Sequence, residues 1–177
     1  MTEPRYQNLE PSDVVLATSH DAGSLIRIIA GIIDGHEGPG GTHTPITICH
    51  VTVSAGHQVI LPWKPAYNAL AYTLSGAGSV GAERVPMQTG RLAVFDAGES
   101  LTFTASETQN LDLYVLGGKP IREPVAKYGP FVMNNRAELQ QAIEDFQAGR
   151  LGTVPANGLR PFLSLIHISE PTRLEPI

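Results

Sequence analysis

The sequence has little cysteine, no long apolar run and no concentration of positive charge. Cys49 is the only cysteine, so no disulfide can form within the chain, and a reducing, cytoplasmic location is expected. No apolar run is long enough to cross a bilayer. No cluster of Lys and Arg marks a nucleic-acid-binding face, and the net charge is -5. The sequence therefore predicts neither a membrane nor a nucleic acid as a partner.

Turn-forming residues are abundant, with 18 Gly and 14 Pro among the 177 residues. They separate short runs with strand character, and the breaks between these runs carry Gly, Asn, Asp or Ser, which accept turn dihedral angles. Within one such break, Ser75–Gly81, the stretch Gly76–Gly81 is interpreted as a hairpin turn. Many short strands without a crossover helix predict an all-β sandwich or barrel. The expected strands are Val14–Ala17, Ser24–Ile33, Ile46–Val53, Gln58–Leu61, Asn68–Leu74, Gly90–Phe95, Ser100–Ala105 and Leu111–Leu116.

One C-terminal helix is expected at about residues 135–148. Asn134 or Asn135 can cap it, and Gly149 or Gly152 can end it. Its apolar side chains recur at helical spacing and form one packing face, which comprises Leu139, Ala142, Ile143 and Phe146.

The last residues are set apart from the fold. Leu163–Arg173 reads LSLIHISEPTR, the in-frame translation of a common transposase-type sequencing adapter. Residues 163–177 are therefore expected to be a sequencing artefact and are excluded from the structural reasoning. The same origin predicts that an upstream part of the protein is missing.

A block near the C-terminus carries a family resemblance. Gly117–Gly152 contains GGKPIREPV, then GPFVMN, then a helix that ends QAGRLG. GPGGTHTPI at Gly38–Ile46, PAYNALAYTLSG at Pro65–Gly76 and the opening MTEPRYQ agree with it. The chain resembles the C-terminal domain of pirins over roughly Met1–Gly152.

The resemblance implies a cupin-type double-stranded β-helix, or jelly-roll barrel, at residues 13–118. Residues 1–12 would be the interdomain linker, and residues 119–152 a C-terminal extension with the helix. Pirins have two such barrels, and their iron sits in the N-terminal one on three histidines and a glutamate. That barrel would be missing here and would be the partner of this domain. Some pirins act on the flavonol quercetin as 2,3-dioxygenases, and others act as iron-dependent transcription cofactors.

The cupin ligand frame can be tested position by position. Its first half, H-x-H followed by Glu, is anchored on Gly56 and Gly76 and places Pro62, Lys64 and Ala69 at the ligand positions. Its second half places Leu101 at the last histidine. None of these side chains offers a lone pair to a metal at neutral pH. The four residues are expected to face inward around a small cavity, and the chain is expected to have no metal, cofactor or catalytic residue of its own.

Other candidate residues carry weaker signals. His36, Glu37 and His43 share a Gly-rich loop, with His50 and His57 downstream, but their spacing matches no metal motif. They are interpreted as solvated or hydrogen-bonded histidines. Cys49 lies in an apolar run and is interpreted as a buried structural thiol.

Large apolar side chains are expected on an outer face. If Ala69, Ala71 and Thr73 point inward, strand alternation turns Leu70, Tyr72 and Leu74 outward. These three, with Leu139, Ile143 and Phe146 of the helix, are the candidate contacts with the missing barrel. Two functions follow: the structural, pocket-completing half of a quercetin dioxygenase, or a non-enzymatic module of an iron-sensing cofactor. An unrelated sugar-binding cupin or epimerase is a third reading, which the Gly117–Gly152 block disfavours.

Overall fold

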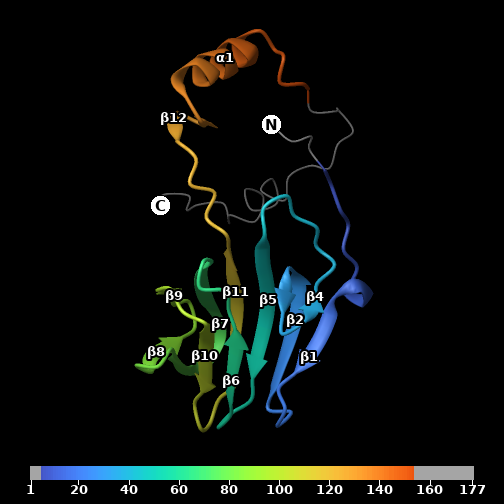
Figure 1. Ribbon diagram of the computed structural model, residues 1–177, viewed down its shortest axis with the longest axis vertical. Coiled ribbons are helices and arrows are strands. Elements are labelled where there is room, and N and C mark those ends of the chain that lie inside the picture. The colour runs from blue at the N-terminus through green and yellow to red at the C-terminus, as the bar shows by residue number, and fades with distance from the viewer. Residues whose placement is uncertain (1–4, 154–177) are drawn as a thin grey trace, which may run out of the picture. The chain divides into compact units, whose positions relative to one another are not determined.

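The computed structural model describes residues 5–153 and divides the chain into two units, Met1–Ile121 and Arg122–Ile177. The adapter-like residues 163–177 lie outside the described part. The first unit holds most strands, and the second holds the helix (Figure 1). The first unit begins with a 3-10 turn, η1 (Pro11–Asp13), followed by β1 (Val15–Thr18), β2 (Ser24–Ala30), β3 (Ile32–Ile33), β4 (His36–Glu37), β5 (Ile46–Val53), β6 (Gln58–Pro62), β7 (Asn68–Val80), β8 (Val85–Gln88), β9 (Leu92–Phe95), β10 (Ser100–Ala105) and β11 (Leu111–Gly118).

Among the described residues, nine strands of the first unit form one curled antiparallel sheet in the order β1-β2-β5-β11-β7-β10-β6, with β8 and β9 paired to β7. The long strand β7 takes part in two regions of the sheet, which we call the two walls of the barrel. Its first half pairs with β11 and β9, and its second half pairs with β10 and β8. The sheet therefore folds over on itself around a core, as expected for a jelly-roll barrel.

Strict alternation of side chains builds that core. Along β2 and β5, every second residue is buried, because successive side chains of a strand point to opposite faces. The inward row Ile28, Cys49, Val115 and Ala71 crosses four neighbouring strands in register, and every member is fully buried. Phe103 of β10 faces the row from the other wall and is also fully buried. Burial raises the pKa of the Cys49 thiol to about 12, as expected for a structural cysteine.

The expected hairpin turn at Gly76–Gly81 is wrong. β7 runs through this stretch to Val80, and the reversal falls just after it, where Arg84 N–H donates to the Gly81 carbonyl at 3.2 Å. Gly76 instead bends the strand: its φ is +85°, and the pairing of β7 with β11 shifts register beside it. The glycines that predicted a turn in this stretch instead allow β7 to bend from one wall of the barrel to the other.

A second deviation concerns the expected strand Ser24–Ile33. It breaks at Gly31, whose φ is +78°, and β3 and β4 then form a small hairpin. Asp34 and Gly35 connect them with positive φ at both positions, which is the pattern of a tight type I′ turn. This hairpin lines a cleft together with Pro62 at the end of β6.

The second unit consists of the hairpin β12 (Ala126–Tyr128) and β13 (Phe131–Met133), followed by α1 (Arg136–Gln147). Asn135 caps the helix by accepting from Glu138 N–H at 2.9 Å, one of the two expected positions. The helix packs on its own hairpin, with the Phe131 and Phe146 rings 5.9 Å apart. Among residues 5–153, no helix is long and apolar enough to cross a lipid bilayer.

Candidate functional site at the barrel mouth

The expected ligand positions do not line one cavity. Ala69 and Leu101 are buried in the core, but Pro62 and Lys64 are exposed. The inward orientation expected for Pro62 and Lys64 is therefore wrong. The burial pattern of β6 gives the reason, because Val59 and Leu61 face the core and Pro62 faces out. Because side chains alternate along a strand, a ligand frame placed one residue out of register predicts the wrong face for every position.

The inward positions at this end of β6 belong to Leu61 and Trp63. Trp63 continues the pairing beyond the strand, since its N–H donates to the Glu99 carbonyl at 2.7 Å, and its side chain is 8% exposed. Tyr67, which is partly buried against the core, follows at the spacing of the cupin glutamate. This displaced H-x-H-x3-E frame is a signal that sequence reasoning missed.

The displaced frame does not fit an iron ion either. Leucine has no donor atom, and the indole of Trp63 offers only an N–H, which donates a proton and has no lone pair for a metal. Tyr67 supplies the single oxygen. Among residues 5–153, no three His, Cys, Asp or Glu side chains group closely enough to hold a metal ion.

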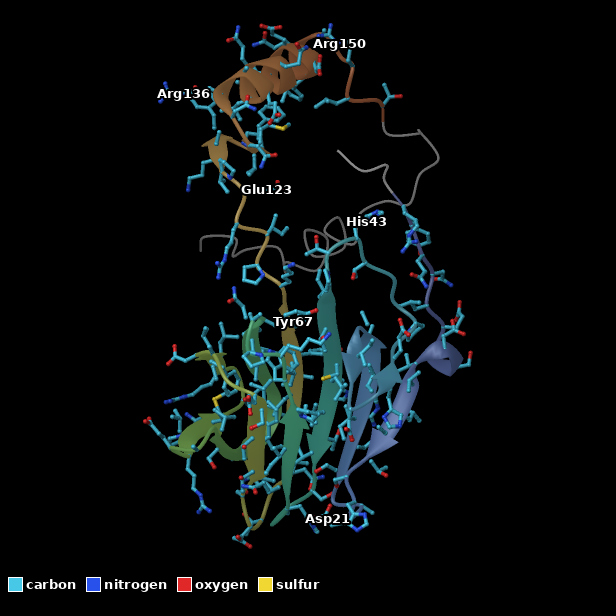
Figure 2. The ribbon with its side chains drawn as sticks, in the orientation of Figure 1. Asp21, His43, Tyr67, Glu123, Arg136 and Arg150 are labelled. Atoms are coloured by element: carbon cyan, nitrogen blue, oxygen red, sulfur yellow. The ribbon has the colours of Figure 1, made fainter. Side chains whose placement is uncertain are left out.

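A cleft of about 620 Å³ opens above these residues. One part of its wall is the β3–β4 hairpin with the loop that follows it, and another is the segment from Pro62 to Tyr67. Tyr67 lies toward the end of the barrel opposite Asp21 (Figure 2). We call this cleft the mouth cleft.

Small residues make room for the aromatic side chains below the mouth cleft. At this end of the sheet Thr47, Gly117 and Ala69 lie in register, and Ala30, which pairs with Ile48 after a register shift, is also buried. A β-carbon added to Gly117 would lie 2.5 Å from Cζ2 of the Trp63 indole, so the indole packs directly on the glycine backbone. The Trp63 indole thus fills the interior at this end of the barrel.

The histidines lie apart from the mouth cleft or at its edge. The Nδ1 atom of His36 is 3.0 Å from the Asp34 carbonyl within the β3–β4 hairpin, and His43 is exposed in the following loop. His50 lies on the outer face, where its Nε2 is 3.5 Å from an Asp112 oxygen. His57 is paired with Asp21. His36, His50 and His57 therefore each contact another residue of the barrel.

The outer face of the sheet carries the expected apolar side chains. Tyr72 and Leu74 are 41% and 37% exposed, and Leu70 is half-buried, while Ala69, Ala71 and Thr73 are buried as expected. Register pairing extends Tyr72 into an outward row across six strands. That row is Leu16, Arg27, His50, Tyr114, Tyr72 and Leu92.

Asp21 ties two turns together at the far end of the barrel. Its carboxylate accepts from Ser19 Oγ at 2.5 Å and from Gly23 N–H at 3.1 Å, and His57 Nδ1 lies 3.1 Å away. The hydrogen bonds from Ser19, Gly23 and His57 hold the pKa of Asp21 well below its usual range. The folded state therefore favours the ionised carboxylate.

Protonation of Asp21 in acid is expected to weaken its hydrogen bonds and so to destabilise the fold. A lowered folded-state pKa stabilises the protein above the ordinary carboxyl pKa of 3.8, and the contribution fades as the pH falls below that value. The melting temperature of the unaltered chain should therefore fall more steeply between about pH 5 and pH 2 than that of Asp21→Asn, which lacks the charge throughout. Asp96→Asn, a change at an exposed carboxylate, serves as the control and should keep the steep acid limb. Equal slopes for Asp21→Asn and the unaltered chain would contradict this assignment.

A curled antiparallel sheet folded around an apolar core, with a cleft at one end, is the architecture of cupin-type barrels. Within that class, residues 48–152 match the family model of the Pirin C-terminal cupin domain, so the chain belongs to the pirin family. The fold and family expected from the sequence are thereby confirmed.

Named relatives agree with this assignment. A Vibrio cholerae protein named "Putative quercetin 2,3-dioxygenase" is 37% identical over 158 residues, which cover 86% of this chain and 54% of that protein. A "Pirin-like protein" of Solanum lycopersicum is 34% identical, with 86% and 52% covered. The crystal structure of a quercetin 2,3-dioxygenase from Acinetobacter baumannii matches with a TM-score of 0.77 at 30% identity, covering 88% of this chain and 53% of that one. The chain thus spans about half the length of the relatives it matches.

Proposed function

We propose that this chain is the metal-less, structural half of a two-barrel pirin, whose other barrel holds iron and carries quercetin 2,3-dioxygenase activity. The chain would be inactive alone and would complete the substrate pocket of the parent. The names of the relatives from Vibrio cholerae and Acinetobacter baumannii support the activity of the parent. The half-length coverage supports the presence of a second barrel.

One observation carries the proposal for this half. The inward positions of the cupin ligand frame hold Leu61, Trp63 and Leu101, which offer no lone pair to a metal. A barrel with this interior can support and shape a neighbouring site, but it cannot hold iron at the cupin position.

The surface that meets the other barrel is proposed to include the outer apolar residues. Tyr72 and Leu74 are substantially exposed, and Phe146 of α1 is 63% exposed. Exposed apolar groups in contiguous patches are typical of interaction sites. Leu70 of the barrel and Leu139 and Ile143 of the helix are half-buried, and each would add to the contacts that its own unit makes.

A second function is kept because several relatives carry pirin names without an activity, including "Pirin" of Rattus norvegicus at 29% identity. In that case the parent would be an iron-sensing regulatory module, and this half would present a docking surface. The net charge of -5 favours a protein partner over direct contact with nucleic acid. In either case we propose a cytoplasmic location, in keeping with the single, buried Cys49.

Metal analysis and oxygen uptake test the proposal together. The purified chain, loaded with Fe(II) and dialysed, should retain well under about 0.1 iron per chain and should consume no oxygen with quercetin, because the barrel interior lacks donors. The two-barrel parent should retain about one iron and, if it is an enzyme, consume oxygen with quercetin. One-to-one iron in this chain alone would overturn the metal-less assignment. Iron binding without turnover in the parent would select the regulatory function.

A further inference from the structure

We propose that the mouth cleft is a binding site for a small planar aromatic molecule with one negative charge. This proposal concerns the described barrel alone and does not depend on the chemistry proposed for the parent. The size of the cleft, its aromatic wall and the charges around it support this class of ligand.

The cleft has the dimensions and walls of a small-molecule site. Its volume of about 620 Å³ falls within the roughly 300–1,000 Å³ of typical ligand pockets. Trp63 and Tyr67 supply aromatic surface on one part of the wall, and Ile32 and Ile46 supply aliphatic surface on another. Both isoleucines are exposed, at 51% and 38%. A flat ring would bury apolar area against all four side chains.

Lys64 places a positive charge at the edge of this aromatic wall. Its Nζ lies 5.2 Å from the centre of the Tyr67 ring, a cation–π contact that holds the ammonium in place. No carboxylate of the described residues is within ion-pair distance of it. Its N–H donors are therefore available to a ligand oxygen.

The other charges around the cleft limit the ligand to a single negative group. The Arg5 guanidinium packs beside Gly41 at the rim, which adds a second cation. Asp34 and Glu37 line the hairpin wall and would repel additional negative charge. An aromatic monoanion fits this arrangement, whereas a nucleotide or polyphosphate does not.

Trp63 lies at the base of the cleft and carries an unpartnered, buried N–H. Its side chain is more than nine-tenths buried, it lines the cleft, and its Nε1–H has no hydrogen-bond partner among the described residues. A buried donor without an acceptor is costly, and buried polar groups in native proteins are nearly always paired. The Nε1 atom itself is buried, so its N–H signal reports packing changes beneath the cleft and not a hydrogen bond to the ligand.

The experiment uses Trp63 as its own reporter, because it is the only tryptophan of the chain. The full chain, labelled with nitrogen-15, is titrated with 2-naphthoate, and the single indole N–H signal is followed by NMR. The neutral amide 2-naphthamide tests whether binding needs the negative charge, and inorganic phosphate tests whether binding needs the aromatic ring. We expect 2-naphthoate to shift the indole signal with a Kd in the roughly 0.1–1 mM range, and the amide to bind about tenfold more weakly. Phosphate should produce no shift.

A matched pair of variants locates the charge. Lys64→Met removes the ammonium, keeps much of the side-chain length at an exposed position, and should weaken 2-naphthoate binding about tenfold. Lys127→Met makes the same change on β12, outside the barrel, and should leave the binding unaltered. No indole shift at 10 mM 2-naphthoate would overturn the proposal, as would equal binding of acid and amide or unaltered binding by Lys64→Met. If Lys64→Met does not fold, the comparison of acid with amide on the unaltered chain decides.

Discussion

Replacing Phe103 with alanine is expected to lower the free energy of unfolding of the barrel by about 3–5 kcal/mol. Phe103 is fully buried, and its ring meets Phe95 edge-on with centroids 6.0 Å apart. The substitution removes this apolar contact area and leaves a cavity between the two walls of the barrel. For a domain of roughly 100 residues, the melting temperature should fall by about 10–20 °C, as followed by circular dichroism.

Phe146→Ala makes the same chemical change at a helix position that is 63% exposed. It should move the melting temperature of the barrel little, because Phe146 contacts Phe131 within the second unit. If the melting temperature of Phe103→Ala lies within a few degrees of that of Phe146→Ala, Phe103 contributes little to the packing between the two walls.

The second large effect concerns Gly76, where β7 bends from one wall of the barrel to the other. Its φ of +85° disfavours any residue with a β-carbon, and a β-carbon at this position would overlap the Asn110 carbonyl oxygen. Gly76→Ala is therefore expected to cost about 2–5 kcal/mol, the sum of backbone strain and a forced backbone shift. Urea unfolding monitored by Trp63 fluorescence measures this cost.

Gly90→Ala separates the two contributions. Gly90 has a φ of +84°, but an added β-carbon would meet nothing within 4 Å. This variant should lose only about 1–2 kcal/mol, which represents the strain of a left-handed conformation alone. Equal losses at Gly76 and Gly90 would show that the Asn110 contact contributes nothing.

Most of the barrel could be predicted from alternation and turn residues. Ile46–Val53 and Ser100–Ala105 were predicted with the observed ends, because both strands are bounded by polar turns on each side. The β8, β12 and β13 strands were missed because they are short and, in β8 and β12, half or more of the residues are exposed to solvent. Such strands depend on pairing with a neighbour, which local pattern does not record.

The candidate site was harder to predict because it depends on register. Counting from Gly56 placed Pro62 and Lys64 inside, whereas the structure places Leu61 and Trp63 there. Hydrophobic pattern alone would have favoured the second choice, since large apolar residues occupy inward positions. The mouth cleft was not predictable in this way, because it joins the β3–β4 hairpin to a segment some thirty residues later through the closure of the barrel.

The shared strand β7 has a consequence for how the barrel comes apart. Because its two halves are hydrogen-bonded into opposite walls, neither wall can detach without removing pairing partners from the other. The barrel should therefore lose its structure in one concerted transition. Its slowest-exchanging amides should lie along the first half of β7 and on β11, where strands flank both edges.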